Sequence, residues 1–123
     1  MRLLFSSATV ENQCRSIKAA GKLFGGDSVM ARSLHARINA LEQASTIHDI
    51  IMQPQFRFHK LEKRGRKDLE GLFSIDVKTR RDAWRIILQP LDENEMPYVP
   101  CHIDEVSTKV RIVAIREVSN HYA

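Results

Sequence analysis

The fold is decided by residues 57–88, which read RFHKLEKRGRKDLEGLFSIDVKTRRDAWRIIL. Near the end of this stretch, Leu72–Val77 places apolar side chains at every second position, and Ala83–Leu88 does the same around Trp84. A period of two predicts half-buried β-strands. Because only residues 78–82 separate the two segments, and all of them are polar or charged, we expect an antiparallel hairpin with a positively charged tip.

The charge excess of the chain lies in the same stretch. Between Arg57 and Arg85, ten basic residues stand against five acidic ones, a local balance of +5, whereas the whole 123-residue chain carries +4. The residues outside the stretch therefore sum to −1. A cationic segment on an otherwise nearly neutral chain indicates a polyanionic partner, with nucleic acid as the first candidate and an acidic protein as the second.

The first half of the chain predicts a short strand followed by two helices. Arg2–Phe5 fits a strand, and Ser7 fits the N-cap of a helix that we expect to end at Gly21. A second helix should begin after Asp27, which is a further N-cap candidate. Apolar residues recur at helical spacing in both helices: Val10, Cys14 and Ile17 in the first, and Met30, Leu34, Ile38 and Leu41 in the second. The resulting αα-hairpin needs a sheet to cover its apolar stripe.

The second half of the chain supplies that sheet. Phe56–His59 alternates as a strand does, Pro90 should end the second strand of the hairpin, and residues 91–100 should form a loop. Lys109–Val118 is β-branched on both faces, which predicts a central strand. We therefore expect a single α+β domain over residues 1–123. Its N-terminal strand and helical hairpin should pack on one face of a small, mainly antiparallel, twisted sheet.

The remaining composition favours a cytoplasmic protein. Cys14 and Cys101 have no CxxC spacing and no companions, so they support neither a disulfide framework nor a zinc ribbon. The apolar run within residues 1–5 is far too short for a signal peptide or a membrane span, so we expect no membrane partner. Cys101, His102 and Asp104 invite a metal site, but such close neighbours on an extended segment cannot converge on one ion without a histidine from elsewhere.

Three segments together resemble one family. The residues PQFRFHKL at 54–61, GLFSIDV at 71–77 and AWRII at 83–87 are similar to motifs of the RelE/ParE superfamily of bacterial toxins, most closely to its HigB-like, plasmid-maintenance killer branch. The resemblance is strongest over residues 54–88 and at Glu117–Tyr122, and weaker over the first 53 residues. It implies a RelE-like fold and a role as the toxin of a type II toxin–antitoxin system.

The activity that this resemblance implies is ribosome-dependent cleavage of mRNA, which inhibits translation and needs no metal or other cofactor. An RNA 2′-hydroxyl attacks the adjacent phosphate, so the site needs a proton acceptor, a proton donor and cations that stabilise the phosphorane. The partners implied are a cognate antitoxin protein, the ribosome and mRNA. The positions that match the family's functional residues are His59, Lys60, Arg85, His121 and Tyr122.

Each matching residue in the hairpin region also has a plainer interpretation. Arg85 alternates with Trp84 and offers a planar fork to two phosphate oxygens, but a strand arginine also pairs with an acidic residue across the sheet. His59 is either a catalytic group near the scissile phosphate or a structural histidine. Lys60 is either a phosphate contact or a proton-transfer group whose pKa is depressed by its cationic neighbours.

The end of the chain departs from the family pattern. Asn120 stands where the family has an acidic residue, and the order of tyrosine and histidine is exchanged in His121–Tyr122. Because adjacent residues of a strand face opposite ways, either His121 or Tyr122 is the candidate for the general acid. The alternative is that these residues form a frayed tail.

The other cations of the stretch are predicted to bind RNA phosphates without reading sequence. They are Arg57, Lys63, Arg64, Arg66, Lys67, Lys78, Arg80 and Arg81. Two other functions remain open at this point. One is a ParE-like toxin that inhibits DNA gyrase through protein contacts alone, and the other is a non-catalytic RNA-binding module.

Overall fold

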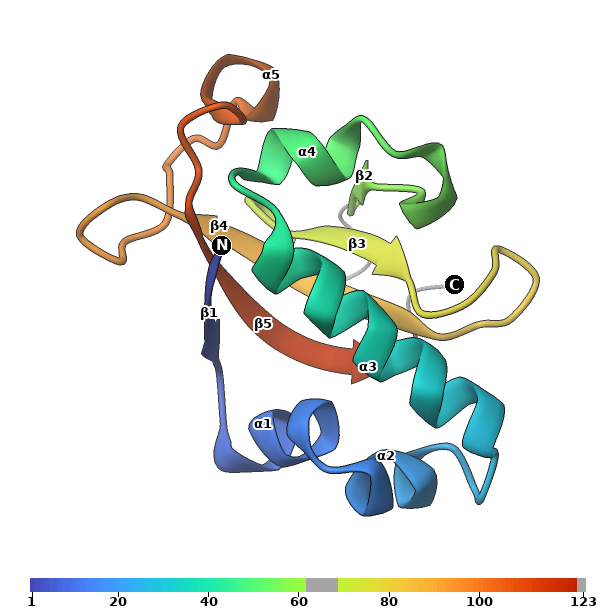
Figure 1. Ribbon diagram of the computed structural model, residues 1–123. Helices are drawn as coiled ribbons and strands as arrows, with labels where there is room; N and C mark the ends of the chain where they lie inside the picture. Colours follow the sequence, from blue (N-terminus) through green and yellow to red (C-terminus); the bar gives the residue numbers. More distant parts are fainter. Residues whose placement is uncertain (62–68, 122–123) are drawn as a thin grey trace.

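The computed structural model describes residues 1–61 and 69–121 and has an α+β fold with a five-stranded sheet (Figure 1). The strand order is β1-β5-β4-β3-β2, in which β1 is parallel to β5 and every other neighbouring pair is antiparallel. The predicted fold class and the mainly antiparallel sheet are therefore confirmed. The strands are β1 (Arg2–Phe5), β2 (His59–Lys60), β3 (Phe73–Asp76), β4 (Arg85–Leu91) and β5 (Ile112–Ser119).

The helices begin where the sequence provides side-chain caps. Ser7 Oγ accepts a hydrogen bond from the Val10 amide at 3.2 Å, and Asp27 Oδ1 accepts from the amides of Val29 and Met30, so both predicted caps are confirmed. The helical segments are α1 (Ala8–Arg15), α2 (Ile17–Leu23), α3 (Ser28–Gln43), α4 (Ile47–Ile51), the 3₁₀ turn η1 (Pro54–Phe56) and α5 (Ile103–Val106).

The predicted end of the first helix at Gly21 is wrong. The helix breaks earlier, at Ser16, whose amide donates to Asn12 O and whose Oγ accepts from the Ala19 amide. Ser16 thus ends α1 and caps α2, and Gly21 lies inside α2. The chain reverses instead at Gly25 and Gly26, whose φ angles of 64° and 91° are ones that L side chains rarely adopt.

The apolar stripe of α3 covers one face of the sheet, as predicted (Figure 1). Met30, Leu34, Ile38 and Leu41 share one buried cluster with β3, β4 and β5 residues such as Ile75, Ile86 and Ile115. The opposite face carries two smaller clusters, built around Ile87 and around Ile112, that contain no residue of a helix. The described helices therefore pack on one face only, and the buried polar pair of Asp76 and Arg85 shares the other face with these apolar clusters.

The expectation that Pro90 ends a strand is wrong, because β4 continues through Pro90 to Leu91. Strand β3 pairs with β4 only from Arg85 to Leu88, so beyond Leu88 that edge of β4 has no neighbour from β3. Proline, which lacks an amide hydrogen, is tolerated where one edge of a strand needs no donor. The loop predicted for residues 91–100 begins one residue later, at 92, and within it Pro97 makes an isolated bridge to Leu91.

The expected strand at Phe56–His59 is also wrong in its first half. Pro54 opens the 3₁₀ turn, Phe56 is buried in the core with 3% exposed surface, and Arg57 takes a left-handed conformation with φ 50° and ψ 51°. Only His59 and Lys60 pair with β3. Burial of the Phe56 ring therefore overrides the alternating pattern and forces a sharp bend before the strand.

Strand β5 lies between β1 and β4, so the predicted central strand is confirmed. It contains a β-bulge: Ile87 pairs with Glu117 and Leu88 with Ile115, which leaves Arg116 without a partner. In a regular strand, residues three positions apart face opposite sides of the sheet. Because of the extra residue, Ile115 and Val118 nevertheless both face the helices. Glu117 and Ser119 therefore lie on the face opposite α3.

Arg37 ties α3 to the turn of the hairpin. Its Nε donates to the carbonyls of Asp76 and Val77 at 3.1 and 3.3 Å, and its Nη2 donates to those of Gln55 and Lys78. The guanidinium also lies over the Phe56 ring at 4.7 Å. Burial is the main influence on the pKa of Arg37 and lowers it, which reflects how far this charge is withdrawn from water.

Replacing Arg37 should therefore weaken the fold. We expect Arg37→Met to lower the free energy of unfolding by about 2 kcal/mol, because several charge-assisted hydrogen bonds to the hairpin are lost. The exposed Arg32 on the same helix provides the control, and Arg32→Met should change the free energy by less than about 0.5 kcal/mol. Urea denaturation followed by circular dichroism measures both, and equal effects of the two substitutions would contradict this role.

Candidate functional site

A buried carboxylate lies at the base of the hairpin. Asp76 and Arg85 are directly opposite each other on β3 and β4, and Arg85 Nε lies 3.2 Å from Asp76 Oδ1. Their side chains are only 2% and 4% exposed. Arg57 holds the same carboxylate from its left-handed bend, with Nε 2.9 Å from Oδ2 and Nη2 3.1 Å from Oδ1. The carboxylate thus receives two guanidinium groups from two separate segments.

The rest of the Arg85 guanidinium is engaged by the hairpin itself. Nη1 donates to the carbonyls of Asp82 and Trp84 at 2.8 and 2.7 Å, and Nη2 donates to the carbonyl of Arg80 at 3.3 Å. This geometry matches the plainer interpretation, in which Arg85 pairs with an acidic residue across the sheet. Because nearly all of its fork is occupied, a direct contact between Arg85 and a phosphate stays a prediction that requires the turn to rearrange.

Arg57 is the member of this cluster that solvent reaches. Its side chain is 42% exposed, ten times the exposure of Arg85. The hydrogen bond to Asp76 is the main cause that raises the pKa of Arg57, so the group stays charged. The sequence predicted only a general RNA contact for this residue; in the structure it is exposed and its backbone carbonyl contacts the His59 ring.

His59 lies next to this cluster on the same face. Its Nδ1 is 2.9 Å from the Arg57 carbonyl oxygen, and its Nε2 is 3.1 Å from Ser74 Oγ. Since a carbonyl oxygen only accepts, this contact assigns the proton of the neutral ring to Nδ1 and leaves the lone pair on Nε2. That is the tautomer a general base requires. Ser74 is itself fully buried and sits where it orients the ring rather than where it would meet a substrate.

Lys60 is separated from His59 by the alternation of β2. It pairs with Phe73, whereas His59 pairs with Ser74, so the two side chains leave the strand on opposite faces. The Lys60 ammonium lies 3.9 Å from Glu70 Oε2, and both groups are about half exposed. Its positive charge also lowers the pKa of the Cys101 thiol, although burial dominates there and raises that pKa. Lys60 is thus directed away from the Asp76 cluster.

His121 follows the end of β5. Ser119 pairs with Arg85, and its Oγ accepts a hydrogen bond from the His121 amide at 3.0 Å. The side chain of His121 is exposed. Since β2 and β5 are three strand positions apart, His59 and the end of β5 are separated by about 14 Å, from a spacing of roughly 4.8 Å per strand. The structure therefore does not bring His121 to His59, and Tyr122 lies outside the described residues.

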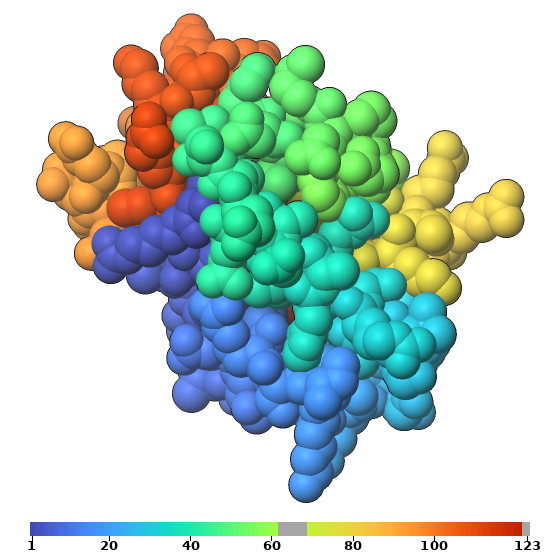
Figure 2. Space-filling view, in the orientation of Figure 1, coloured from blue at the N-terminus to red at the C-terminus, as the bar shows by residue number. Residues whose placement is uncertain are grey.

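The predicted phosphate-binding residues divide into two groups. Lys78, Arg80 and Arg81 lie exposed in the turn of the hairpin, whose side chains project from the body of the molecule in yellow in Figure 2. Asp82 orders this turn, because its carboxylate accepts from the amides of Thr79 and Trp84, each at 2.9 Å. The other group, Lys63, Arg64, Arg66 and Lys67, lies outside the described residues.

Among residues 1–61 and 69–121, no group of three or more His, Cys, Asp or Glu side chains is arranged to hold a metal ion. In the same part of the chain, no helix has the length and apolar character needed to span a membrane.

The roles of Arg85 and Arg57 in stability should differ. We expect Arg85→Met to lower the free energy of unfolding by about 3 kcal/mol, because it removes the buried partner of a buried carboxylate. Arg57→Met should cost less than about 1 kcal/mol, since the exposed member of the cluster is lost and Arg85 still holds Asp76. Chemical denaturation of the two variants makes the comparison. A larger loss for Arg57→Met than for Arg85→Met would reverse this assignment.

Comparison with known proteins assigns the chain to no family. No family model matches the chain, and neither a curated protein nor a solved structure matches it. The function proposed below therefore rests on the motifs of the sequence and on the geometry of the Asp76 cluster and His59.

Proposed function

We propose that the chain is the toxin of a type II toxin–antitoxin system and cleaves mRNA on the ribosome without a metal. One observation carries the proposal: a histidine whose Nδ1 is anchored by a backbone carbonyl and whose Nε2 contacts the Ser74 hydroxyl lies beside an exposed arginine, in the most basic part of the chain. A proton acceptor next to a phosphate-binding cation is the minimum that RNA cleavage by its own 2′-hydroxyl requires.

In this mechanism His59 acts as the general base. When the contact of His59 Nε2 with Ser74 Oγ, 3.1 Å in the structure, is exchanged for the substrate, Nε2 removes the proton from the RNA 2′-hydroxyl. The 2′-oxygen then attacks the adjacent phosphorus and forms a 2′,3′-cyclic phosphate. The bond from phosphorus to the 5′-oxygen of the next nucleotide breaks. Arg57 stabilises the negative charge that gathers on the phosphorane oxygens through the donors that Asp76 leaves free, which are Nη1 and the second hydrogen of Nη2. Asp76 and Arg85 act as positioning residues that hold the Arg57 fork.

The leaving 5′-oxygen needs a proton, and His121 or Tyr122 remains the candidate donor. An imidazolium or a phenol at the end of the chain suits that role chemically. For His121 to serve, RNA must lie across the sheet from β2 toward β5, which the row of cations in the hairpin turn favours by attracting the phosphate backbone. Lys60 contributes to attraction of RNA rather than to proton transfer.

A non-catalytic RNA-binding module is the second candidate. It is favoured by one observation: within the described residues, the candidate donor His121 is three strands away from His59. In that case Arg57 and the hairpin cations hold RNA, and no bond is cleaved. In either case, the basic segment should attract an antitoxin with acidic or amphipathic segments, encoded beside the toxin.

Induced expression with matched variants tests the proposal. We expect the unmodified chain to arrest growth and to cleave mRNA on purified ribosomes. His59→Ala should reduce the cleavage rate about 10²- to 10⁴-fold, the usual contribution of a general base, and Arg57→Ala should also reduce it strongly. The exposed residues His102 and Arg32 provide controls, and His102→Ala and Arg32→Ala should leave cleavage unchanged.

Three outcomes decide between the candidates. Full cleavage by a folded His59→Ala variant would exclude His59 as the base. Ribosome binding without any cleavage by the unmodified chain would instead favour the RNA-binding module. Growth arrest with intact mRNA and blocked DNA gyrase would favour a ParE-like inhibitor over both.

A further inference from the structure

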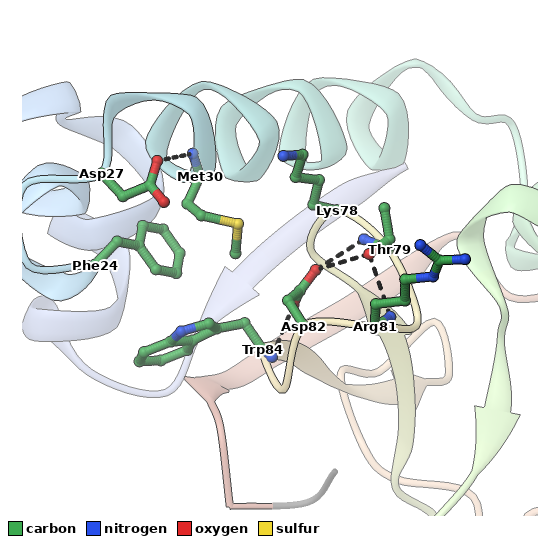
Figure 3. A pocket seen from close by; sticks show the side chains of 8 residues that line it. All are labelled: Phe24, Asp27, Met30, Lys78, Thr79, Arg81, Asp82 and Trp84. Carbon is green, nitrogen blue, oxygen red and sulfur yellow. Dashed lines mark hydrogen bonds between the residues drawn. The ribbon is translucent and has the colours of Figure 1, made fainter.

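A pocket lies on the other side of the hairpin, between its turn and the helices. It has a volume of about 420 Å³. Figure 3 shows Phe24, Met30 and Trp84 forming its apolar wall and Lys78 reaching from the turn toward α3, whereas the Arg81 guanidinium points away from the aromatic rings in this view. Asp82, which also lines the pocket, lies 3.7 Å from Nη1 of Arg85, so the pocket adjoins the Asp76 cluster from the other face of the hairpin.

The cations at the rim are free to bind a ligand, whereas the carboxylates of Asp82 and Asp27 already accept hydrogen bonds from backbone amides. Asp82 accepts from the amides of Thr79 and Trp84, and Asp27 Oδ1 accepts from the first amides of α3. By contrast, in the described part of the chain, Lys78 Nζ and the Arg81 guanidinium make no hydrogen bond or ion pair. The charge that the pocket offers to a ligand is therefore positive.

The apolar wall is aromatic. The rings of Phe24 and Trp84 meet edge to face, with centroids 4.9 Å apart and planes at 85°. Such a pair presents a rigid corner against which a flat ring packs, and Met30 adds a polarisable thioether to the same wall. Both aromatic rings are only partly buried, so part of this surface meets solvent.

The pocket and the Asp76 cluster lie on opposite faces of the hairpin, at the point where β4 begins. Trp84 and Arg85 are neighbours, and the side chain of Trp84 packs with the helices whereas Arg85 faces Asp76. The turn with Lys78, Arg80 and Arg81 connects the two sides. A flexible polyanion that follows these cations around the turn therefore passes from one side to the other.

We propose that this pocket binds one nucleotide of single-stranded RNA, with the base against Trp84 and Phe24 and the phosphates at Lys78 and Arg81. The inference rests on the proposed function, because it places an RNA subsite beside the cleavage site. Aromatic rings beside unpaired cations are the usual combination for single-stranded nucleic acid. Asp27 Oδ2, which accepts no hydrogen bond from the described residues, can receive one from a base amino group. An acidic peptide would pair with the cations but would bring no flat ring to the corner formed by Trp84 and Phe24.

The test uses the fluorescence of Trp84, which is the only tryptophan in the chain. We expect a single-stranded RNA hexamer to quench it in a saturable way, and adenosine monophosphate to do so at higher concentration. Inorganic phosphate and a hexaglutamate peptide should not quench it. Quenching by hexaglutamate but not by RNA would overturn the proposal and identify a protein-docking surface instead.

A charge-matched pair of variants separates the pocket from general attraction to RNA. The double variant Lys78→Glu with Arg81→Glu should lose the quenching and reduce the slope of log K against log salt by about 2, one for each phosphate contact. Lys18→Glu with Lys109→Glu changes the net charge equally, at exposed positions away from the pocket, and should keep the quenching. Equal loss in both double variants would show general electrostatic attraction and overturn the pocket.

The same assay distinguishes failure of the pocket from failure of the proposed function. His59→Ala should retain full quenching by RNA while it loses cleavage. Cleavage by the unmodified chain without any quenching would overturn the pocket alone. Quenching without cleavage would sustain the pocket and overturn the nuclease.

Discussion

The carboxylate of Asp76 is the constraint on which the rest of the structure depends. A buried carboxylate is strongly unfavourable unless charged donors surround it, and here they come from different parts of the chain. Arg85 reaches it from the opposite strand, Arg57 from the bend before β2, and Arg37 of α3 takes the carbonyl oxygen of the same residue. One residue therefore fixes the hairpin, the start of the edge strand and the long helix relative to one another.

This arrangement also links the candidate base to the candidate cation. The Arg57 side chain holds Asp76, while its carbonyl oxygen receives the Nδ1 proton of His59. The left-handed bend at Arg57 is what allows one residue to make both contacts from opposite sides of its backbone. The tautomer of the histidine and the direction of the exposed fork are thus set by the same turn, and neither can change without the other.

Much of the fold could be predicted from local patterns. Local patterns of the sequence predicted the caps at Ser7 and Asp27, the apolar stripe of α3 and the hairpin of β3 and β4. The structure contains each of them. Pairing of Asp76 with Arg85 was also within reach, because the two residues are equally distant from the middle of the turn at 80–81. The bend at Arg57 and the passage of β4 through Pro90 were not, since the first depends on burial of Phe56 and the second on where a neighbouring strand stops. The separation of His59 from His121 depends on strand order, which no local pattern contains.

The bulge at Arg116 has a consequence for the end of the chain. One extra residue in β5 reverses the alternation of the side chains that follow it in the strand, and so places Glu117 and Ser119 on the face of Arg85. Without it, those positions would turn toward the helices and their even-numbered neighbours would take their place. The pairing of Ser119 with Arg85 therefore depends on the bulge, and so does the place of the Ser119 hydroxyl that receives the His121 amide.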